Sequence, residues 1–175
     1  MGKWLARIAA SVIAGVLVWQ ITKPWSISST EPLDVPKTAS LVSQDKVSLR
    51  ADVYWAPSGV AVKKGDWITI AAEGQWWSGI NNTDPAGDNG VFGFFRPACG
   101  ACPVPGARLG ELVGRIGNGP PFRIGMHSTR VCEREGGLRF AMNDNIGPCK
   151  LKGEGSCYDD NNGDITINVS LYRIK

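Results

Sequence analysis

The sequence predicts an all-β domain, a sandwich or a barrel, that follows a single N-terminal transmembrane helix. Short segments in which apolar and polar residues alternate recur from about residue 46 onward, and a period of two is typical of strands with one buried face. Turns rich in Gly, Pro, Asn and Asp separate these segments. No long stretch after the apolar N-terminal segment has the 3.6-residue period of an amphipathic helix.

The predicted transmembrane helix lies within residues 4–25, WLARIAASVIAGVLVWQITKPW. Its apolar part extends from Leu5 to Ile21, close to the minimum length for crossing a bilayer. Lys3 and Arg7 indicate that the N-terminus is cytoplasmic. The domain after the helix is therefore expected on the periplasmic, extracytoplasmic side of the inner membrane. The alternative is a cleaved signal peptide, but no clear small-x-small cleavage site follows. Residues 1–25 are therefore expected to be an anchor that contacts lipid, or a signal peptide.

The small positive charge of the chain belongs to this N-terminal segment. The 175 residues include 19 Lys and Arg and 16 Asp and Glu, a net charge of +3. Three of the basic residues and none of the acidic ones lie in residues 1–25, so the remainder is neutral. A nucleic-acid-binding domain needs a basic surface to neutralise phosphates, and we therefore expect no nucleic acid among the partners.

The rest of the chain divides into a linker, residues 26–45, and a domain, residues 46–175. The linker is rich in Ser, Thr and Pro and lacks apolar periodicity. Pro57-Ser58-Gly59, Lys64-Gly65-Asp66 and Asn118-Gly119-Pro120 are expected turns. The strand candidates, in chain order, are 47–53, 67–72, 91–96, 111–116, 138–142 and 165–172.

The five cysteines suggest disulfides, since an exported chain meets an oxidising compartment. Cys149 and Cys157 bracket a Gly-rich loop that a bridge would close, and Cys99 and Cys102 would form a local bridge. Cys132 would then be buried and unpaired, or paired to another chain. Pairing of Cys132 with one of the other four remains an alternative.

No catalytic motif accompanies the single histidine, His127. A Gly-x-Ser-x-Gly elbow and a His-Glu-x-x-His helix are both absent from the sequence. The sequence therefore predicts a protein that is not an enzyme.

An acidic and amide-rich segment, CYDDNNGDITINV, precedes the last strand candidate. Asp159, Asp160, Asn161 and Asn162 offer consecutive oxygen ligands of the kind that calcium prefers. An EF-hand does not fit, because its first and twelfth loop positions would be Tyr158 and Val169. The ion would need further ligands from residues 141–145, AMNDN, at the end of another strand. The alternative is a polar turn without a metal.

Four segments in this order resemble the bacterial PA-IL-like (LecA-type) family of calcium-dependent galactose lectins over residues 47–173. They are residues 62–76, which contain GDWITIAAEG, residues 110–122, GELVGRIGNGPPF, residues 138–145, LRFAMNDN, and residues 158–171, YDDNNGDITINVSL. The resemblance implies a jelly-roll-like β-sandwich in which sugar hydroxyls bind a protein-held calcium directly.

Carried over to this sequence, the resemblance implies that the side chains of Asp144, Asp160 and Asn161 bind calcium. Backbone carbonyls near Ser78 and Cys157 would complete the metal site. The sugar would lie against the following residues: Asp144, Asn145, Asp160, Asn161 and Trp76.

Trp76 is included because it or Trp77 offers an aromatic face on which a sugar could stack. The sequence departs from the family in two places. The segment between Asp144 and Asp160 is longer, and residues 81–90 lack a match to the histidine-containing sugar-contact segment.

Two functions follow from these observations. The first is a membrane-tethered, extracytoplasmic sugar-binding module with calcium as its cofactor. The second is an accessory subunit of an inner-membrane complex, for example a respiratory or photosynthetic one, whose lectin-like domain packs against other membrane-protein subunits.

Overall fold

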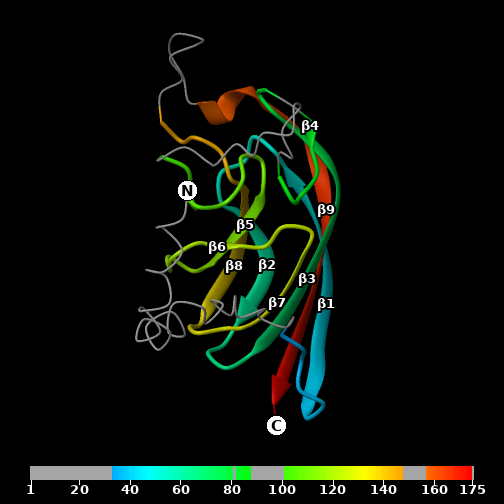
Figure 1. Cartoon of the computed structure of the whole chain (residues 1–175). Coiled ribbons are helices and arrows are strands. Elements are labelled where there is room, and N and C mark those ends of the chain that lie inside the picture. Colours follow the sequence, from blue (N-terminus) through cyan, green and yellow to red (C-terminus); the bar gives the residue numbers. More distant parts are fainter. Residues whose placement is uncertain (1–32, 81, 88–100, 148–156, 175) are drawn as a thin grey trace, which may run out of the picture. The chain divides into compact units, whose positions relative to one another are not determined.

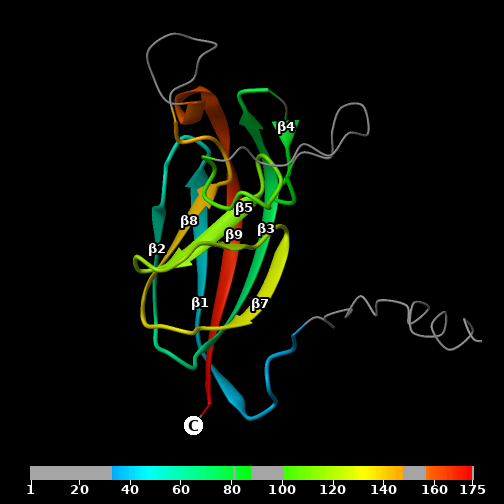
Figure 2. The same ribbon diagram turned by 60° about the vertical axis from the view of Figure 1, so that its left-hand side comes forward.

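The computed structural model describes residues 33–80, 82–87, 101–147 and 157–174, which form two antiparallel sheets (Figures 1 and 2). The larger sheet has the order β1-β9-β3-β4, and β7 also pairs with β3. The smaller sheet has the order β2-β8-β5-β6. The strands of the larger sheet are β1 (Ala39–Arg50), β3 (Trp67–Ser78), β4 (Asn82–Thr83), β7 (His127–Val131) and β9 (Asn161–Ile174). Those of the smaller sheet are β2 (Ala56–Val62), β5 (Leu112–Ile116), β6 (Phe122–Arg123) and β8 (Gly136–Met142).

The two sheets pack face to face around one main core, which confirms an all-β, sandwich-like fold. The residues expected to face inward in β3, β8 and β9 are all buried, which confirms the predicted inner face, although Ala141 on the other face of β8 is buried too. The inward-facing residues are Ile68, Ile70 and Ala72 in β3, Leu138, Phe140 and Met142 in β8, and Ile165, Ile167, Val169 and Leu171 in β9. The core therefore forms where the inner faces of these strands meet.

The prediction that residues 26–45 are a linker is wrong for residues 39–45. Residues 39–45 are the first part of β1, an edge strand whose register with β9 extends from Ala39, opposite Ile174, to Arg50, opposite Asp164. Most of this half of β1 is exposed or half-buried, so its sequence lacks the alternation that buried strands show. Main-chain pairing with β9, which sequence periodicity does not report, makes it a strand.

The expected turn at Pro57-Ser58-Gly59 is also wrong, since these residues lie inside β2. The register of β2 with β8 shifts between Pro57 and Ala61, and Gly59 has a φ of 82°. The Ser58 hydroxyl donates to the Leu138 carbonyl oxygen at 2.8 Å and thereby holds the irregular strand in the sheet. A turn-like sequence here encodes a bulge.

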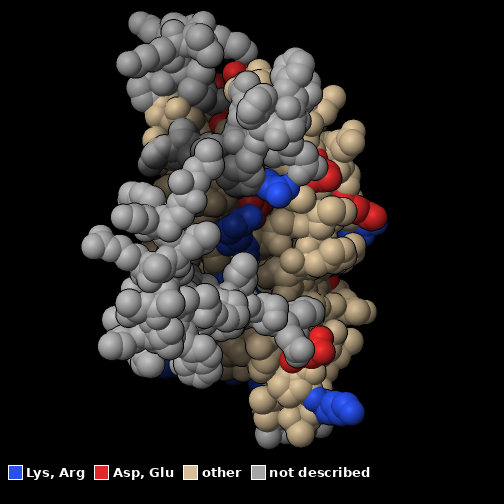
Figure 3. All heavy atoms as spheres, viewed as in Figure 1, with Lys and Arg blue, Asp and Glu red and all other residues tan. Residues whose placement is uncertain are grey.

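Several sequence predictions fall outside the described residues. The anchor, residues 1–25, is among them, as is the strand candidate 91–96. The described residues contain no helix that is both long and apolar enough to cross a membrane. On the face drawn in Figure 3, the visible Lys and Arg side chains are scattered among Asp and Glu instead of forming a continuous basic surface.

A partly buried ion pair ties the last strand to the turn before β3. Asp66 is 2% exposed and accepts two hydrogen bonds from Arg173, at 2.7 Å from Nε and 2.6 Å from Nη2. The Lys63 backbone N–H donates to the same carboxylate at 2.8 Å. The Arg173 guanidinium lowers the pKa of Asp66 below its usual value; burial opposes this shift, and the Lys63 N–H adds to it.

We expect Asp66→Asn to lower the Tm, because the amide cannot accept both hydrogen bonds from Arg173. The folded chain holds Asp66 ionised more readily than the unfolded chain does, so its stabilising effect is full above about pH 4. It is lost as the pH falls through the lower pKa of the folded state. Thermal melts from pH 7 to pH 2 should therefore show the wild-type advantage shrinking with acid.

The control is Asp52→Asn, which breaks an exposed ion pair with Arg50 and should change the Tm little. A wild-type advantage that stays constant down to pH 2 would contradict the assignment to Asp66.

Candidate functional site

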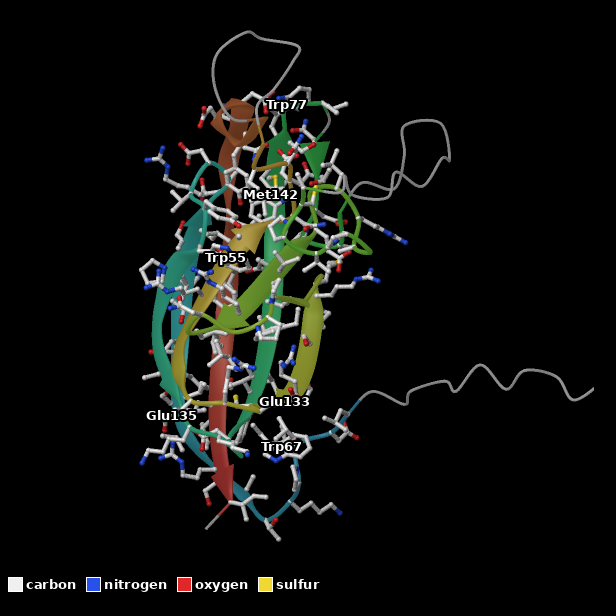
Figure 4. The ribbon with its side chains drawn as sticks, turned by 90° about the vertical axis from the view of Figure 1, so that its left-hand side faces the viewer. Trp55, Trp67, Trp77, Glu133, Glu135 and Met142 are labelled. Atoms are coloured by element: carbon white, nitrogen blue, oxygen red, sulfur yellow. The ribbon has the colours of Figure 1, made fainter. Side chains whose placement is uncertain are left out.

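Three chain segments meet at one end of the sandwich, where the sequence predicted a metal site. They are the end of β3, the residues that follow β8, and the short 3-10 helix η2 (Cys157–Asp160) with the start of β9. Ser78, the last residue of β3, is paired in register with Asn161, the first residue of β9. Figure 4 shows this end at Trp77, with Met142 below it.

Asp144 is a buried carboxylate with only part of its hydrogen-bonding capacity used. It is 4% exposed, its Oδ1 accepts the Asn145 backbone N–H at 2.7 Å, and its Oδ2 has no partner among the described residues. Burial raises the pKa of Asp144 to about 6, the Asn145 N–H and the nearby Asn161 side chain oppose this shift, and the charge of Asp160 adds to it. Among the described residues, the ionised carboxylate therefore has no counter-charge.

Asn161 is the second buried side chain with unused polar atoms. It is 6% exposed, and neither Oδ1 nor Nδ2 makes a hydrogen bond of normal geometry to any described residue. Most buried amides in folded proteins are hydrogen-bonded, because an unsatisfied one destabilises the fold. The polar atoms of Asp144 and Asn161 that lack hydrogen bonds to described residues therefore lie close together.

Asp160 reaches the same region from η2 and packs against the turn after β3. A Cβ atom added at Gly79 would collide with the Asp160 carboxylate, and Gly79 has a φ of 76°. Both facts require glycine at this position. The absence of a side chain at Gly79 therefore brings Asp160 close to the Ser78 end of β3.

The framework around these residues is held by side chains that the sequence did not single out. The Tyr158 hydroxyl, itself buried, donates to the Met142 carbonyl oxygen at 2.9 Å and joins η2 to the end of β8. The Asn143 amide is fully buried and bonds to the main chain of Val104 and Arg108. The neighbouring residues Asn143 and Asp144 therefore have different roles, since Asn143 holds a loop and Asp144 faces the site.

The sugar-contact prediction for Trp76 is wrong. Trp76 is 1% exposed and its indole N–H donates to the Gly110 carbonyl oxygen at 2.9 Å, so its ring belongs to the core. Strand alternation turns the next residue outward, and Trp77 is 38% exposed. Trp77 is therefore the member of the pair that a ligand can reach.

The donor set fits a hard cation better than a soft one. No three residues among His, Cys, Asp and Glu cluster in the described part of the chain. Two carboxylates and an amide oxygen, with nearby main-chain carbonyls, match the ligands of calcium. The orphaned Asp144 Oδ2 and Asn161 Oδ1 are the atoms such an ion would satisfy.

The remaining predicted site residues are placed as follows. Asn145 is half-buried and its Oδ1 accepts the Gly147 backbone N–H at 2.8 Å. Cys157 is the first residue of η2. Its side chain, and its predicted disulfide partner Cys149, are outside the described part of the structure.

Cys132 and His127, which the sequence singled out, lie in different environments. Cys132 is buried without a disulfide, and burial raises the pKa of its thiol to about 11. His127 is exposed on β7.

A replacement of Asp144 should reveal the unbalanced charge in the absence of divalent cations. Because the folded-state pKa lies above that of an unfolded Asp, wild type should lose stability as the pH rises from about 4 to about 6. We expect Asp144→Asn to remove this loss and, in chelator at pH 7, to raise the free energy of unfolding by up to about 3 kcal/mol. Urea denaturation at several pH values measures it.

The matched control is Asp164→Asn, an exposed acid on β9, which should follow the wild-type pH dependence. Equal stability of wild type and Asp144→Asn at all pH values would contradict the burial of an unpaired carboxylate.

Comparison with known proteins agrees with this architecture. A solved structure described as "EclA N-terminal domain; PllA-like lectin" is similar over 75% of this chain and 97% of that chain, with 26% sequence identity and a TM-score of 0.53. No family model matches the chain, and no curated protein does. The chain therefore has a lectin-like fold, as the sequence resemblance implied in general terms.

Proposed function

We propose that this protein is a carbohydrate-binding module whose binding depends on calcium held at the end of the sandwich. The observation that carries the proposal is the pair of buried, unsatisfied oxygens, Asp144 Oδ2 and Asn161 Oδ1, on two segments that the fold brings together. The lectin-like fold supports carbohydrate as the ligand class, and the four sequence segments described above favour a calcium-dependent member of that class.

In this proposal the side chains of Asp144, Asp160 and Asn161 hold the ion. The carbonyl oxygens of Ser78 and Cys157 lie at the ends of β3 and the start of η2, where they would add neutral ligands. Bound calcium supplies a hard positive centre that accepts sugar hydroxyl oxygens in place of water. It would also provide a counter-charge for Asp144, which has none among the described residues.

The protein residues then determine which sugar is accepted. Asp144, Asn145, Asp160 and Asn161 surround the proposed ion and would accept or donate hydrogen bonds to hydroxyls that do not contact it. Trp77 is the exposed aromatic residue at the end of β3 that can pack against an apolar sugar face. Trp77 thus takes the sugar-stacking role that the sequence predicted for Trp76.

We further propose that residues 4–25 tether the domain to the inner membrane with the lectin-like part outside the cytoplasm. The support is the apolar segment and its flanking Lys3 and Arg7. The competing proposal is that the protein is an accessory subunit of an inner-membrane complex.

Calcium should stabilise the wild-type chain by mass action, by about 2.7 kcal/mol at a concentration 100-fold above its Kd. Asp144→Ala combined with Asp160→Ala should abolish this effect, because both carboxylate ligands are gone. Thermal melts with calcium and with chelator measure it. Asp164→Ala removes one exposed acid outside the site and should respond to calcium as wild type does.

Binding to a glycan array in calcium should be lost on adding chelator and in the double variant. Stabilisation by calcium without binding to any glycan would leave a metal site but contradict the carbohydrate function.

The membrane proposal has its own test. The full-length chain should remain with membranes after extraction at alkaline pH and leave them only with detergent. It should then purify as a single polypeptide in mild detergent. Release at alkaline pH would contradict the anchor, and stoichiometric co-purification with other membrane subunits would favour the accessory role.

A further inference from the structure

A small cavity lies at one edge of the sandwich, where β7 of the larger sheet meets β6 and the turn after β5. Its volume of about 30 Å³ is enough for one small polar group. Figure 4 places Glu133, one of its lining residues, toward the end of the sandwich opposite Trp77. The cavity is therefore separate from the proposed calcium site. Its lining residues are Ile116, Pro120, Phe122, Arg130, Glu133 and Arg134.

Arg130 places an incompletely satisfied cation in this cavity. Its Nε atom is buried and has no hydrogen-bond acceptor among the described residues. The guanidinium carbon lies 3.5 Å from the centre of the Phe122 ring, which fixes its position by a cation–π contact. Burial lowers the pKa of Arg130, against a smaller opposing effect of Glu133. A ligand oxygen at Nε would remove the unsatisfied donor.

Two glycines make room for the cavity's functional side chains. A Cβ atom at Gly114 would lie 2.9 Å from Cε2 of the Phe122 ring, and one at Gly119 would lie 2.6 Å from Cδ and Nε of Arg134. Neither glycine has a positive φ, so the requirement here is close approach and not backbone conformation. Gly114 thus admits the ring that supports Arg130, and Gly119 lets Arg134 lie across the turn.

We propose that this cavity binds the carboxylate group of an acidic ligand through Arg130 and Arg134. The planar guanidinium fork of arginine matches the two oxygens of a carboxylate. Two arginines against the single acid Glu133 leave one net positive charge, which suits a monovalent carboxylate better than a dianionic phosphate. The site does not depend on calcium or on the proposed carbohydrate function, since none of its lining residues belongs to the metal site.

The test follows the arginine side-chain N–H resonances of the full-length, ¹⁵N-labelled chain by NMR. Sodium acetate is titrated at constant ionic strength against sodium chloride, with inorganic phosphate and D-glucose as comparison probes. We expect a saturable shift of the Arg130 Nε–H resonance with acetate, weaker binding of phosphate and no shift with glucose. The absence of saturation with acetate overturns the proposal, and tighter binding of phosphate overturns the carboxylate assignment.

Variants identify the residues responsible. Arg130→Gln and Arg134→Gln should each weaken acetate binding at least tenfold, read from backbone N–H resonances around the cavity. Arg139→Gln removes an exposed arginine of β8 outside the cavity and should leave the affinity unchanged.

Because Arg130→Gln could fail to fold, a second variant tests the cavity with both arginines still present. Gly119→Ala keeps both arginines but displaces Arg134, and it should also weaken binding. Acetate affinity that is unchanged in Gly119→Ala and in both arginine variants overturns the assignment.

Discussion

The antiparallel pairing of β3 with β9 is the constraint on which the rest of the structure depends. Its register extends from Trp67, opposite Tyr172, to Ser78, opposite Asn161. Alternate residues of both strands fill the core, so a slip of β9 by one residue would turn its apolar face toward solvent. The same register brings Asn161 to the end of β3 and Arg173 near Asp66. Core and candidate metal site are therefore set by one ladder, and the ion pair reinforces its far end.

The two ends of this ladder use charge differently. At one end the carboxylate of Asp66 is fully engaged by Arg173 and a main-chain N–H, and its pKa is lowered. At the other end Asp144 is buried next to Asp160, its pKa is raised, and one of its oxygens has no hydrogen-bond partner in the described part of the chain. Satisfied charge stabilises a fold, whereas unsatisfied buried charge opposes folding until a ligand balances it. This contrast within one small domain separates a structural site from a candidate binding site.

Glycine recurs where side chains of distant segments come close. Gly79 admits the Asp160 carboxylate beside β3, and Gly119 admits Arg134 beside the turn after β5. In both places the neighbour is a charged side chain, so the glycine determines where a charge can lie. The proposed calcium site and the carboxylate cavity are built in this same way at different places in the sandwich.

The sequence by itself determined the all-β class, the strands with a buried face and the residue types of the candidate metal site. Alternation in β3, β8 and β9 identifies their inner faces, and clustered carboxylate and amide side chains are typical of calcium ligands. The tertiary structure decided the rest, because it depends on contacts between distant residues. β1 is a strand through its pairing with β9, and β2 continues through a turn-like bulge. Trp76 faces inward and Trp77 outward because successive residues of a strand point to opposite faces, and packing against the other sheet selects the buried one.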